Sequence, residues 1–122
     1  MKPEDYLHIA LCDGLSGISY WGFDIKYSNS QYEKEAEYYR GKRMSPCYED
    51  VLVRIIENGG KIKFVDIEGD GAYSVTLTQQ MLHDNMKYVP QEVLKHIESE
   101  DYDADDTDKF LQSILFKEVI FG

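Results

Sequence analysis

The chain has little cysteine, no long apolar run and few basic residues, and each shortage excludes a class of protein. Its two cysteines, Cys12 and Cys47, are too few for a disulfide framework, and no Cys/His cluster has zinc-ligand spacing. No run approaches the ~18 apolar residues of a membrane span, and the acidic N-terminus lacks the apolar core of a signal peptide. We therefore expect a cytoplasmic protein with reduced thiols, no cofactor and no membrane partner.

Basic residues are outnumbered, with 13 Lys and Arg against 23 Asp and Glu and a net charge of −10. Direct binding to nucleic acid is not expected, because a phosphate backbone requires clustered Lys and Arg. The acidic excess is local, since residues 98–108 hold seven of the acids and no base, which leaves 16 acids against 13 bases elsewhere. We expect a solvated acidic loop over 98–108, in which Asp105 or Asp106 caps the next helix.

The hydrophobic pattern predicts a single domain over residues 1–122 of the α+β class. We expect a small antiparallel sheet of three or four strands with helices packed on one face. Helices are predicted over 3–13, from Ser45 to 57, after Thr78, from Pro90 and over 105–116, and strands over 18–27, 61–67, 72–77 and 117–121. Residues 28–44 are polar and are predicted to form a variable exposed loop or a short helix.

The stretch GLSGISYW, residues 14–21, holds the only tryptophan. Two glycines three residues apart predict that the first helix ends there. Alternation in the strand expected to follow places Trp21 on the buried side and Tyr20 on the outer side. Tyr20 is therefore the aromatic residue that we expect to contact a partner.

Three motifs occur in a fixed order: GISYW (17–21), IENGGKIKFVDIEGD (56–70) and DADDTDKFLQSILFKEVIFG (103–122). In these motifs the chain resembles a functionally uncharacterised family of small acidic proteins encoded by phages and prophages. That family has a G-x-x-Y-W motif and a tail of the form F-L-Q…F-x-E-V-x-F-G, with glycine usual where this chain has Lys117. The resemblance implies a mobile-element origin and a bacterial host cytoplasm, and it implies no particular activity.

Metal and catalytic motifs are weak. Asp101, Asp103 and Asp105 alternate as in a calcium loop, but the sixth and twelfth positions are Asp106 and Gln112 where that loop requires glycine and glutamate. The three histidines show no metal-ligand spacing, and no nucleophile, acid and base can be assembled from motifs. We therefore expect no metal site and no enzyme.

The favoured hypothesis is a non-enzymatic accessory protein that binds a host or phage protein, with anti-defence versions as a host-factor inhibitor or a nucleic-acid mimic. Exposed tyrosines give contact area at low entropic cost, and Asp108 and Gln112 share a helix face. The predicted partner-binding residues are Tyr20, Tyr38, Tyr39, Asp103, Asp105, Asp106, Asp108 and Gln112. The alternative is a binder of a small nucleotide-like ligand, held between the sheet and the first helix near Tyr20 and Trp21. A homodimer through the predicted edge strand 117–121 is a further expectation.

Overall fold

The structure, a computed structural model, describes residues 1–121, with the side chain of Ser16 left aside; Gly122, the last residue of the tail motif, lies outside it. The helices are α1 (Pro3–Tyr20), α2 (Asn29–Gly41), α3 (Tyr48–Glu57), α4 (Gln79–Asn85), the short 3-10 helix η1 (Met86–Tyr88), α5 (Gln91–Glu98) and α6 (Ala104–Phe116). The strands are β1 (Phe23–Lys26), β2 (Lys61–Asp66) and β3 (Val75–Thr78). The predicted α+β class is confirmed.

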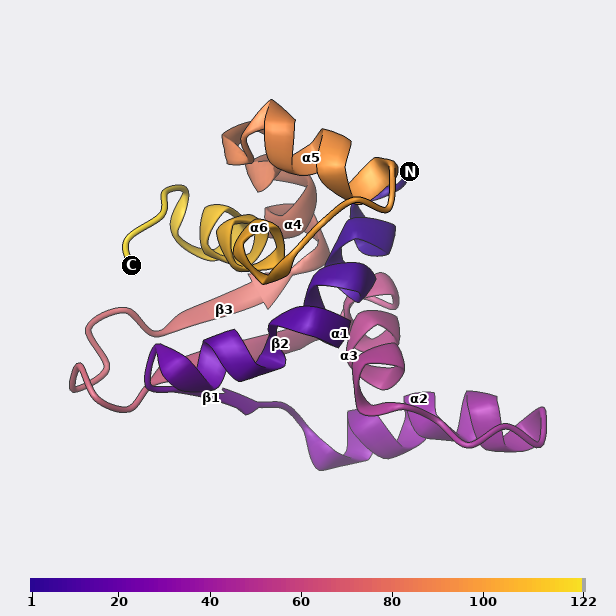
Figure 1. Cartoon of the computed structure of the whole chain (residues 1–122). Helices are drawn as coiled ribbons and strands as arrows, with labels where there is room; N and C mark the ends of the chain where they lie inside the picture. Colours follow the sequence, from indigo (N-terminus) through magenta and orange to yellow (C-terminus); the bar gives the residue numbers. More distant parts are fainter. Residues whose placement is uncertain (122) are drawn as a thin grey trace.

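The sheet is antiparallel with the order β1-β2-β3. The central strand alternates as its sequence predicts: Ile62, Phe64 and Asp66 are buried, whereas Lys61 and Lys63 are exposed. Helices α1, α3, α4 and α6 contact the strands, and Figure 1 shows α1 passing over the sheet with α6 beside β3. The helices therefore cover one face, as predicted, and the lysine-bearing face stays open.

Helix α1 continues through Gly14 and Gly17 to Tyr20, so the predicted helix end and the strand from residue 18 are wrong. Each glycine costs an isolated helix ~1 kcal/mol, but here α6 packs across α1 at these positions. A Cβ at Gly14 would lie 2.6 Å from Leu111 Cδ1, and one at Gly17 would lie 3.3 Å from Asp108 Oδ1. The two glycines are thus a contact surface for α6. The helix ends at Tyr20, and Gly22, two residues later, takes a left-handed conformation with φ +82°.

The hairpin turn is longer than EGDG and spans residues 67–74, so β3 begins at Val75 and the expected strand over 72–74 is wrong. The buried Asp66 carboxylate organises this turn. It accepts hydrogen bonds from the backbone N–H groups of Gly69 (2.7 Å) and Tyr73 (3.1 Å). At the end of β2, hydrogen bonds to the Asp66 side chain therefore take the place of backbone pairing between strands. Tyr73 lies in the turn and is exposed.

The predicted final strand over 117–121 is also wrong, because none of the described residues there forms a strand. Lys117 ends α6 in the left-handed region with φ 65°, a conformation that favours glycine. The backbone N–H groups of Ile120 and Phe121 donate to Gln112 Oε1, both at 2.8 Å. Two of the backbone N–H groups that an edge strand would offer are therefore used internally. The strand through which a homodimer is expected is not formed by the described residues.

The two polar segments are more ordered than predicted. Of the two alternatives for 28–44, the helix is found, as α2; its buried Glu35 accepts a hydrogen bond from Asn58 at the end of α3. Helix α3 begins at Tyr48, after the predicted Ser45 start. Residues 98–108 are not one loop, because α5 ends at Glu98 and α6 begins at Ala104 within this segment. Asp103, rather than Asp105 or Asp106, caps α6.

One hydrophobic core joins the elements from α1 to α6. Apolar residues recur at helical spacing in α3, which predicts a buried stripe of Tyr48, Val51, Leu52, Ile55 and Ile56; all are buried except Tyr48, which is half-buried. The same spacing in α6 predicts a stripe of Phe110, Leu111, Ile114 and Leu115, and all four are buried. Among the described residues, no helix combines the length and apolarity needed to cross a membrane.

The contact between α1 and α6 predicts that adding a side chain at Gly14 destabilises the fold, whereas adding one at a glycine away from this contact does not. Gly14→Val should lower the free energy of unfolding by about 2–3 kcal/mol, because the added methyl groups clash with the buried Leu111 side chain. Gly41→Val on α2 is the matched control, since a Cβ there meets nothing within 4 Å, and it should change stability by less than about 0.5 kcal/mol. Urea unfolding followed by circular dichroism measures both. Equal effects at the two glycines would contradict the packing role.

Candidate functional site

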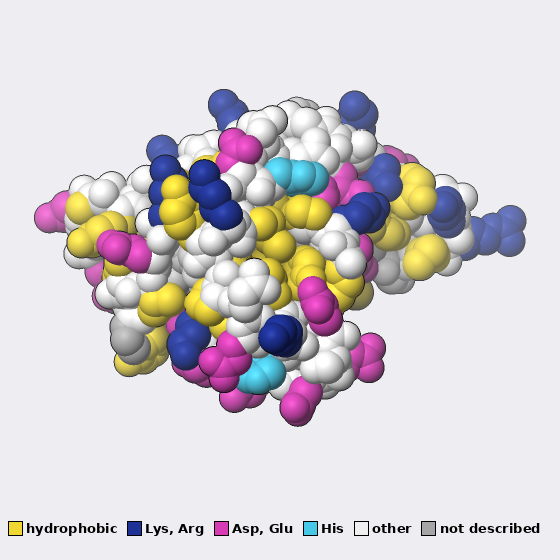
Figure 2. Space-filling model, turned by 90° about the horizontal axis from the view of Figure 1, so that it is seen from above, with side chains coloured by type: hydrophobic (Ala, Val, Ile, Leu, Met, Phe, Trp, Pro, Cys, Tyr) yellow, Lys and Arg dark blue, Asp and Glu magenta, His cyan; other side chains and the backbone are white. Residues whose placement is uncertain are grey.

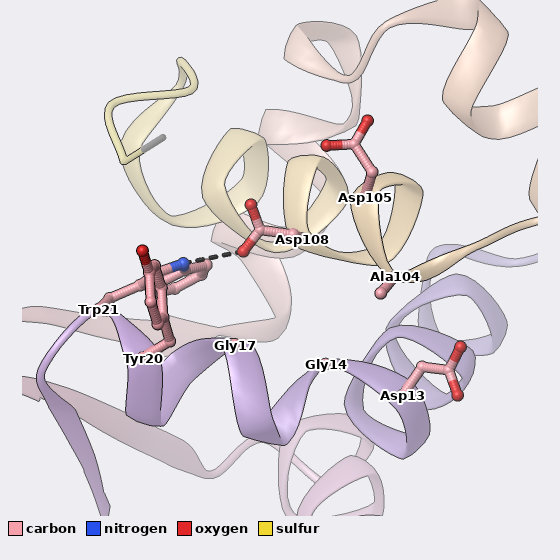
Figure 3. A pocket seen from close by; sticks show the side chains of 8 residues that line it. All are labelled: Asp13, Gly14, Gly17, Tyr20, Trp21, Ala104, Asp105 and Asp108. Atoms are coloured by element: carbon pink, nitrogen blue, oxygen red, sulfur yellow. Dashed lines mark hydrogen bonds between the residues drawn. The ribbon is translucent and has the colours of Figure 1, made fainter.

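A groove of about 330 Å³ runs between α1 and α6 (Figure 3). It is lined by Asp13, Gly14, Gly17, Tyr20, Trp21, Ala104, Asp105 and Asp108. The small residues Gly14, Gly17 and Ala104 form its floor, since they carry no side chain beyond Cβ. Aromatic and acidic side chains stand at its edges, so the groove combines an apolar floor with a negative rim.

Tyr20 and Trp21 are neighbours in the chain but have opposite roles. The side chain of Tyr20, on the last turn of α1, is 79% exposed, whereas Trp21 is 6% exposed. Both predicted orientations hold, although they arise from the end of a helix and not from strand alternation. Tyr20 at the rim can therefore contact another molecule without any change in the fold.

A chain of hydrogen bonds links Trp21 to the C-terminal segment. Trp21 Nε1 donates to Asp108 Oδ1 (2.8 Å), as Figure 3 shows, and Gln112 Nε2 donates to Asp108 Oδ2 (2.8 Å). Gln112 Nε2 also donates to the carbonyl oxygen of Phe121 (3.0 Å), while its Oε1 accepts from Ile120 and Phe121. Gln112 is fully buried, so the expectation that it shares an exposed face with Asp108 is wrong. It is a positioning residue for the tail.

The tail that Gln112 holds covers a cluster of aromatic rings. The Phe121 ring stacks on Trp21 with centroids 5.7 Å apart and meets Phe23 edge-on at 5.6 Å. Phe116 and Tyr73 also contact Phe121. Edge-to-face and stacked pairs each add ~0.5–1.5 kcal/mol beyond their buried area. The predicted core role of Trp21 is thus confirmed, and the C-terminal segment meets the end of α1 and the start of β1 at this cluster.

The carboxylates around the groove differ in how far they are already neutralised. Asp105 pairs with Lys109 at 2.9 Å, and Asp108 is held by Trp21 and Gln112. Asp13 has no cationic partner within the described part of the chain. The described residues contain no group of three or more His, Cys, Asp or Glu side chains arranged to hold a metal ion.

Two of the predicted acidic binding residues cap α6. The backbone N–H of Asp106 donates to Asp103 Oδ1 (3.0 Å), and that of Asp103 donates to Asp106 Oδ2 (3.2 Å). His96 Nδ1 lies 3.1 Å from both Asp106 oxygens. The hydrogen bond to Asp106 raises the pKa of His96 above its ordinary value. Burial acts to raise the pKa of Asp106, but the bonds from His96 and Asp103 outweigh it and lower that pKa.

Tyr38 and Tyr39 lie away from the groove on α2, at the lower right of Figure 1. The Arg54 guanidinium stacks on the Tyr38 ring, 3.5 Å from its centroid. The Tyr39 hydroxyl donates to the backbone oxygen of Asp50 at 3.5 Å. Both tyrosines join α2 to α3, so the structure does not bring them together with Tyr20.

Cys12, His8 and Asp50 lie together where α1 meets α3, but their geometry differs from a catalytic triad. A triad needs one histidine nitrogen on the nucleophile and the other on the acid. Here Nε2 of His8 makes the contact with Asp50 and is also the nitrogen 3.9 Å from Cys12 Sγ. Burial and the nearby Glu49 and Asp50 raise the pKa of the Cys12 thiol to about 11. Cys12 is therefore protonated at neutral pH and a poor nucleophile.

Of the predicted binding residues, the groove brings together Tyr20, Asp105 and Asp108. Sequence reasoning missed Asp13 and the bond between Trp21 and Asp108. The signal for the groove was present, because small residues at a spacing of three or four within an apolar helix mark a close helix crossing. Nothing local to the sequence marks Asp108 as the partner of a tryptophan 87 residues away.

A second hollow, of about 540 Å³, lies on the other side of Tyr20 and Trp21 and is lined also by Asp66, Glu68, Gly69, Tyr73 and Phe121. This is the place between sheet and first helix where the alternative hypothesis puts a nucleotide-like ligand. Asp66 and Glu68 give it negative charge, which opposes a phosphate group. Its chemistry does not favour a nucleotide.

No protein-family model matches the chain, and neither the curated proteins nor the solved structures give a match.

Gln112 offers a test of the network that holds the tail. Gln112→Ala should lower the free energy of unfolding by about 2–4 kcal/mol, because it leaves two backbone N–H groups and the Asp108 carboxylate with fewer partners. The variant should also shift Trp21 fluorescence to longer wavelength as the tail is released. Gln80→Ala, which removes an exposed i,i+4 bond to Asp84, is the control and should change stability by under about 0.5 kcal/mol. An unchanged Trp21 spectrum in Gln112→Ala would rule out the network.

His96 should make the stability depend on pH. Its folded pKa is raised, so its contribution is fully present below the unfolded value of about 6.5 and is lost as pH rises through the folded pKa. Asp106, whose pKa is lowered, stays ionised over this range. His96→Gln should therefore destabilise the protein more at pH 5.5 than at pH 8.5, as measured by urea unfolding. Lys95→Gln, one residue away on α5, should show no such difference. Equal losses for His96→Gln at the two pH values would refute the pairing.

Proposed function

We propose that the chain is a non-enzymatic accessory protein of a phage or prophage, which acts in the host cytoplasm by binding a host or phage protein. The groove between α1 and α6 receives a basic side chain of that partner. The observation that carries the proposal is Tyr20, a large aromatic ring that is 79% exposed beside a groove with negative walls. An exposed ring next to carboxylates suits a guanidinium or ammonium group, through cation–π and charge attraction together.

The resemblance to phage-encoded proteins supports the choice of this groove. The motif GISYW contributes Tyr20 and Trp21, and the tail motif contributes Asp108, Gln112 and Phe116. These residues meet around one groove and one aromatic cluster. Residues of both motifs therefore lie at a single site in the fold, and Tyr20 is the exposed aromatic residue at that site.

Among anti-defence roles, we favour inhibition of a host factor over mimicry of nucleic acid. A mimic needs carboxylates spread over a rigid surface at phosphate-like spacing. In residues 98–108, Asp103 and Asp106 are engaged in capping α6, and Asp108 accepts from Trp21. Glu98 accepts from the Tyr6 hydroxyl. The face in Figure 2 intersperses Lys and Arg with Asp and Glu, which suits a protein surface better than a polyanion.

Binding of a small ligand near Tyr20 and Trp21 is a second candidate, supported by the hollow of about 540 Å³ at that place. Its acidic and aromatic lining suits a cationic or neutral aromatic compound. Because Trp21 lines this hollow, such a ligand would change Trp21 fluorescence when a metabolite pool is added.

The protein-binding proposal is tested by pull-down from a bacterial host lysate with variants of the bait. Tyr20→Ala and Asp13→Lys should each reduce capture of the main co-purifying protein by at least about tenfold, because one removes the ring and the other reverses the unpaired charge. Tyr88→Ala and Asp84→Lys are matched controls away from the groove, and both should retain capture. Mass spectrometry quantifies the captured protein.

A partner retained by both groove variants would refute the groove as the binding site. Salt dependence then separates the two anti-defence versions. If the protein inhibits a DNA-binding enzyme equally at low and high salt, electrostatic mimicry is untenable.

A further inference from the structure

The open face of the sheet concentrates positive charge in a chain whose net charge is −10. Lys61 and Lys63 lie on the outer side of β2, because Ile62 and Phe64 between and after them are buried. Lys26 of β1 lies directly opposite Lys63 in the strand register. Three ammonium groups from two neighbouring strands therefore share one face, on the side away from the helices that cover the sheet.

These lysines are poorly neutralised by the protein itself. Lys26 pairs with Asp24 at 2.9 Å, but Lys61 and Lys63 form no ion pair with any described residue. Like charges directly across a pair of strands reduce the stability of the sheet. An anion seated between Lys26 and Lys63 would remove this repulsion.

The same face is hollowed. A cavity of about 400 Å³ is lined by Lys26, Tyr27, Ser28, Gln31, Lys61, Lys63 and Thr76. Gln31, in the first turn of α2, lies so close to Gly60 that a Cβ there would be 2.0 Å from its Nε2, so the start of α2 forms one wall. The volume falls in the range of small-molecule sites, and hydroxyl and amide donors stand beside the lysines.

We propose that this cavity binds a phosphate-bearing small molecule, with Lys61 and Lys63 as the principal ligands of a phosphate group. A phosphate group carries up to two negative charges and three acceptor oxygens, which matches several converging donors better than a single carboxylate does. Thr76, opposite Lys63 on β3, and Gln31 supply neutral hydrogen bonds. The site is separate from the groove that carries the proposed protein-binding function, so the two stand or fall independently.

The test is a titration of the isotope-labelled chain, followed by its backbone amide NMR signals, with inorganic phosphate, pyrophosphate and ATP in parallel. Saturable shifts confined to residues around Lys26, Gln31, Lys61, Lys63 and Thr76 are expected. Saturation by inorganic phosphate or pyrophosphate as well as by ATP identifies the phosphate as the recognised group, whereas saturation by ATP alone assigns a nucleotide. A glutamate-rich peptide is the fourth arm. If that peptide saturates these signals and the phosphates do not, the face is a protein-docking surface and the proposal is overturned.

Variants separate binding from folding. The double variant Lys61→Gln/Lys63→Gln should weaken the phosphate-bearing probe that saturates by at least about tenfold, because it removes two charge-assisted hydrogen bonds. Its thermal midpoint should stay the same or rise, since like-charge repulsion is relieved. Lys95→Gln on α5 removes one exposed charge elsewhere and should leave the dissociation constant within about twofold. Binding that survives in the double variant, or no saturable shift with any phosphate, overturns the proposal.

Discussion

The close approach of α1 and α6 is the constraint on which the rest of the structure depends. Gly14 and Gly17 leave room for the side chains of Leu111 and Asp108, so the first and the last helix of the chain pack closely. Because α6 is held this near, the carboxylate of Asp108 reaches the indole of Trp21. The same approach leaves the shallow groove between the helices. A bulkier residue at Gly14 would separate the helices and remove both.

From that contact the polar network extends to the end of the chain. Asp108 orients Gln112, and Gln112 holds the backbone of residues 120 and 121. The tail then places Phe121 on Trp21 and Phe23. Each buried polar group in this series has its partners, which is the condition for burial to stabilise a fold. Of the two aromatic residues in the motif GISYW, Tyr20 is the one that takes no part in this network.

The charges of the chain are sorted by the fold rather than spread evenly. The acidic segment around residues 98–108 serves the start of α6, where carboxylates complement the helix dipole and its free N–H groups. The open face of the sheet holds Lys61 and Lys63, which form no ion pair with any described residue. The protein therefore presents two surfaces of opposite character, a negative groove with an exposed ring and a positive hollow on the sheet. The formal net charge of −10 describes neither of these surfaces.

The sequence by itself determined the α+β class, the apolar stripes of α3 and α6 and the buried face of β2, because periodicity and local turn residues encode these. The burial of Trp21 is predicted correctly, but from a strand alternation that the structure does not contain. The sequence also singled out Tyr20, Asp105 and Asp108. Only the tertiary structure decided that α1 continues through two glycines, that residues 117–121 form no strand, and that Gln112 is buried. In each case a long-range contact outweighs a local preference: α6 fills the space beside the glycines, and a buried amide takes the N–H groups a strand would use. Helix propensities differ by only ~1 kcal/mol per residue and depend on the local sequence, so they carry no information about such long-range contacts.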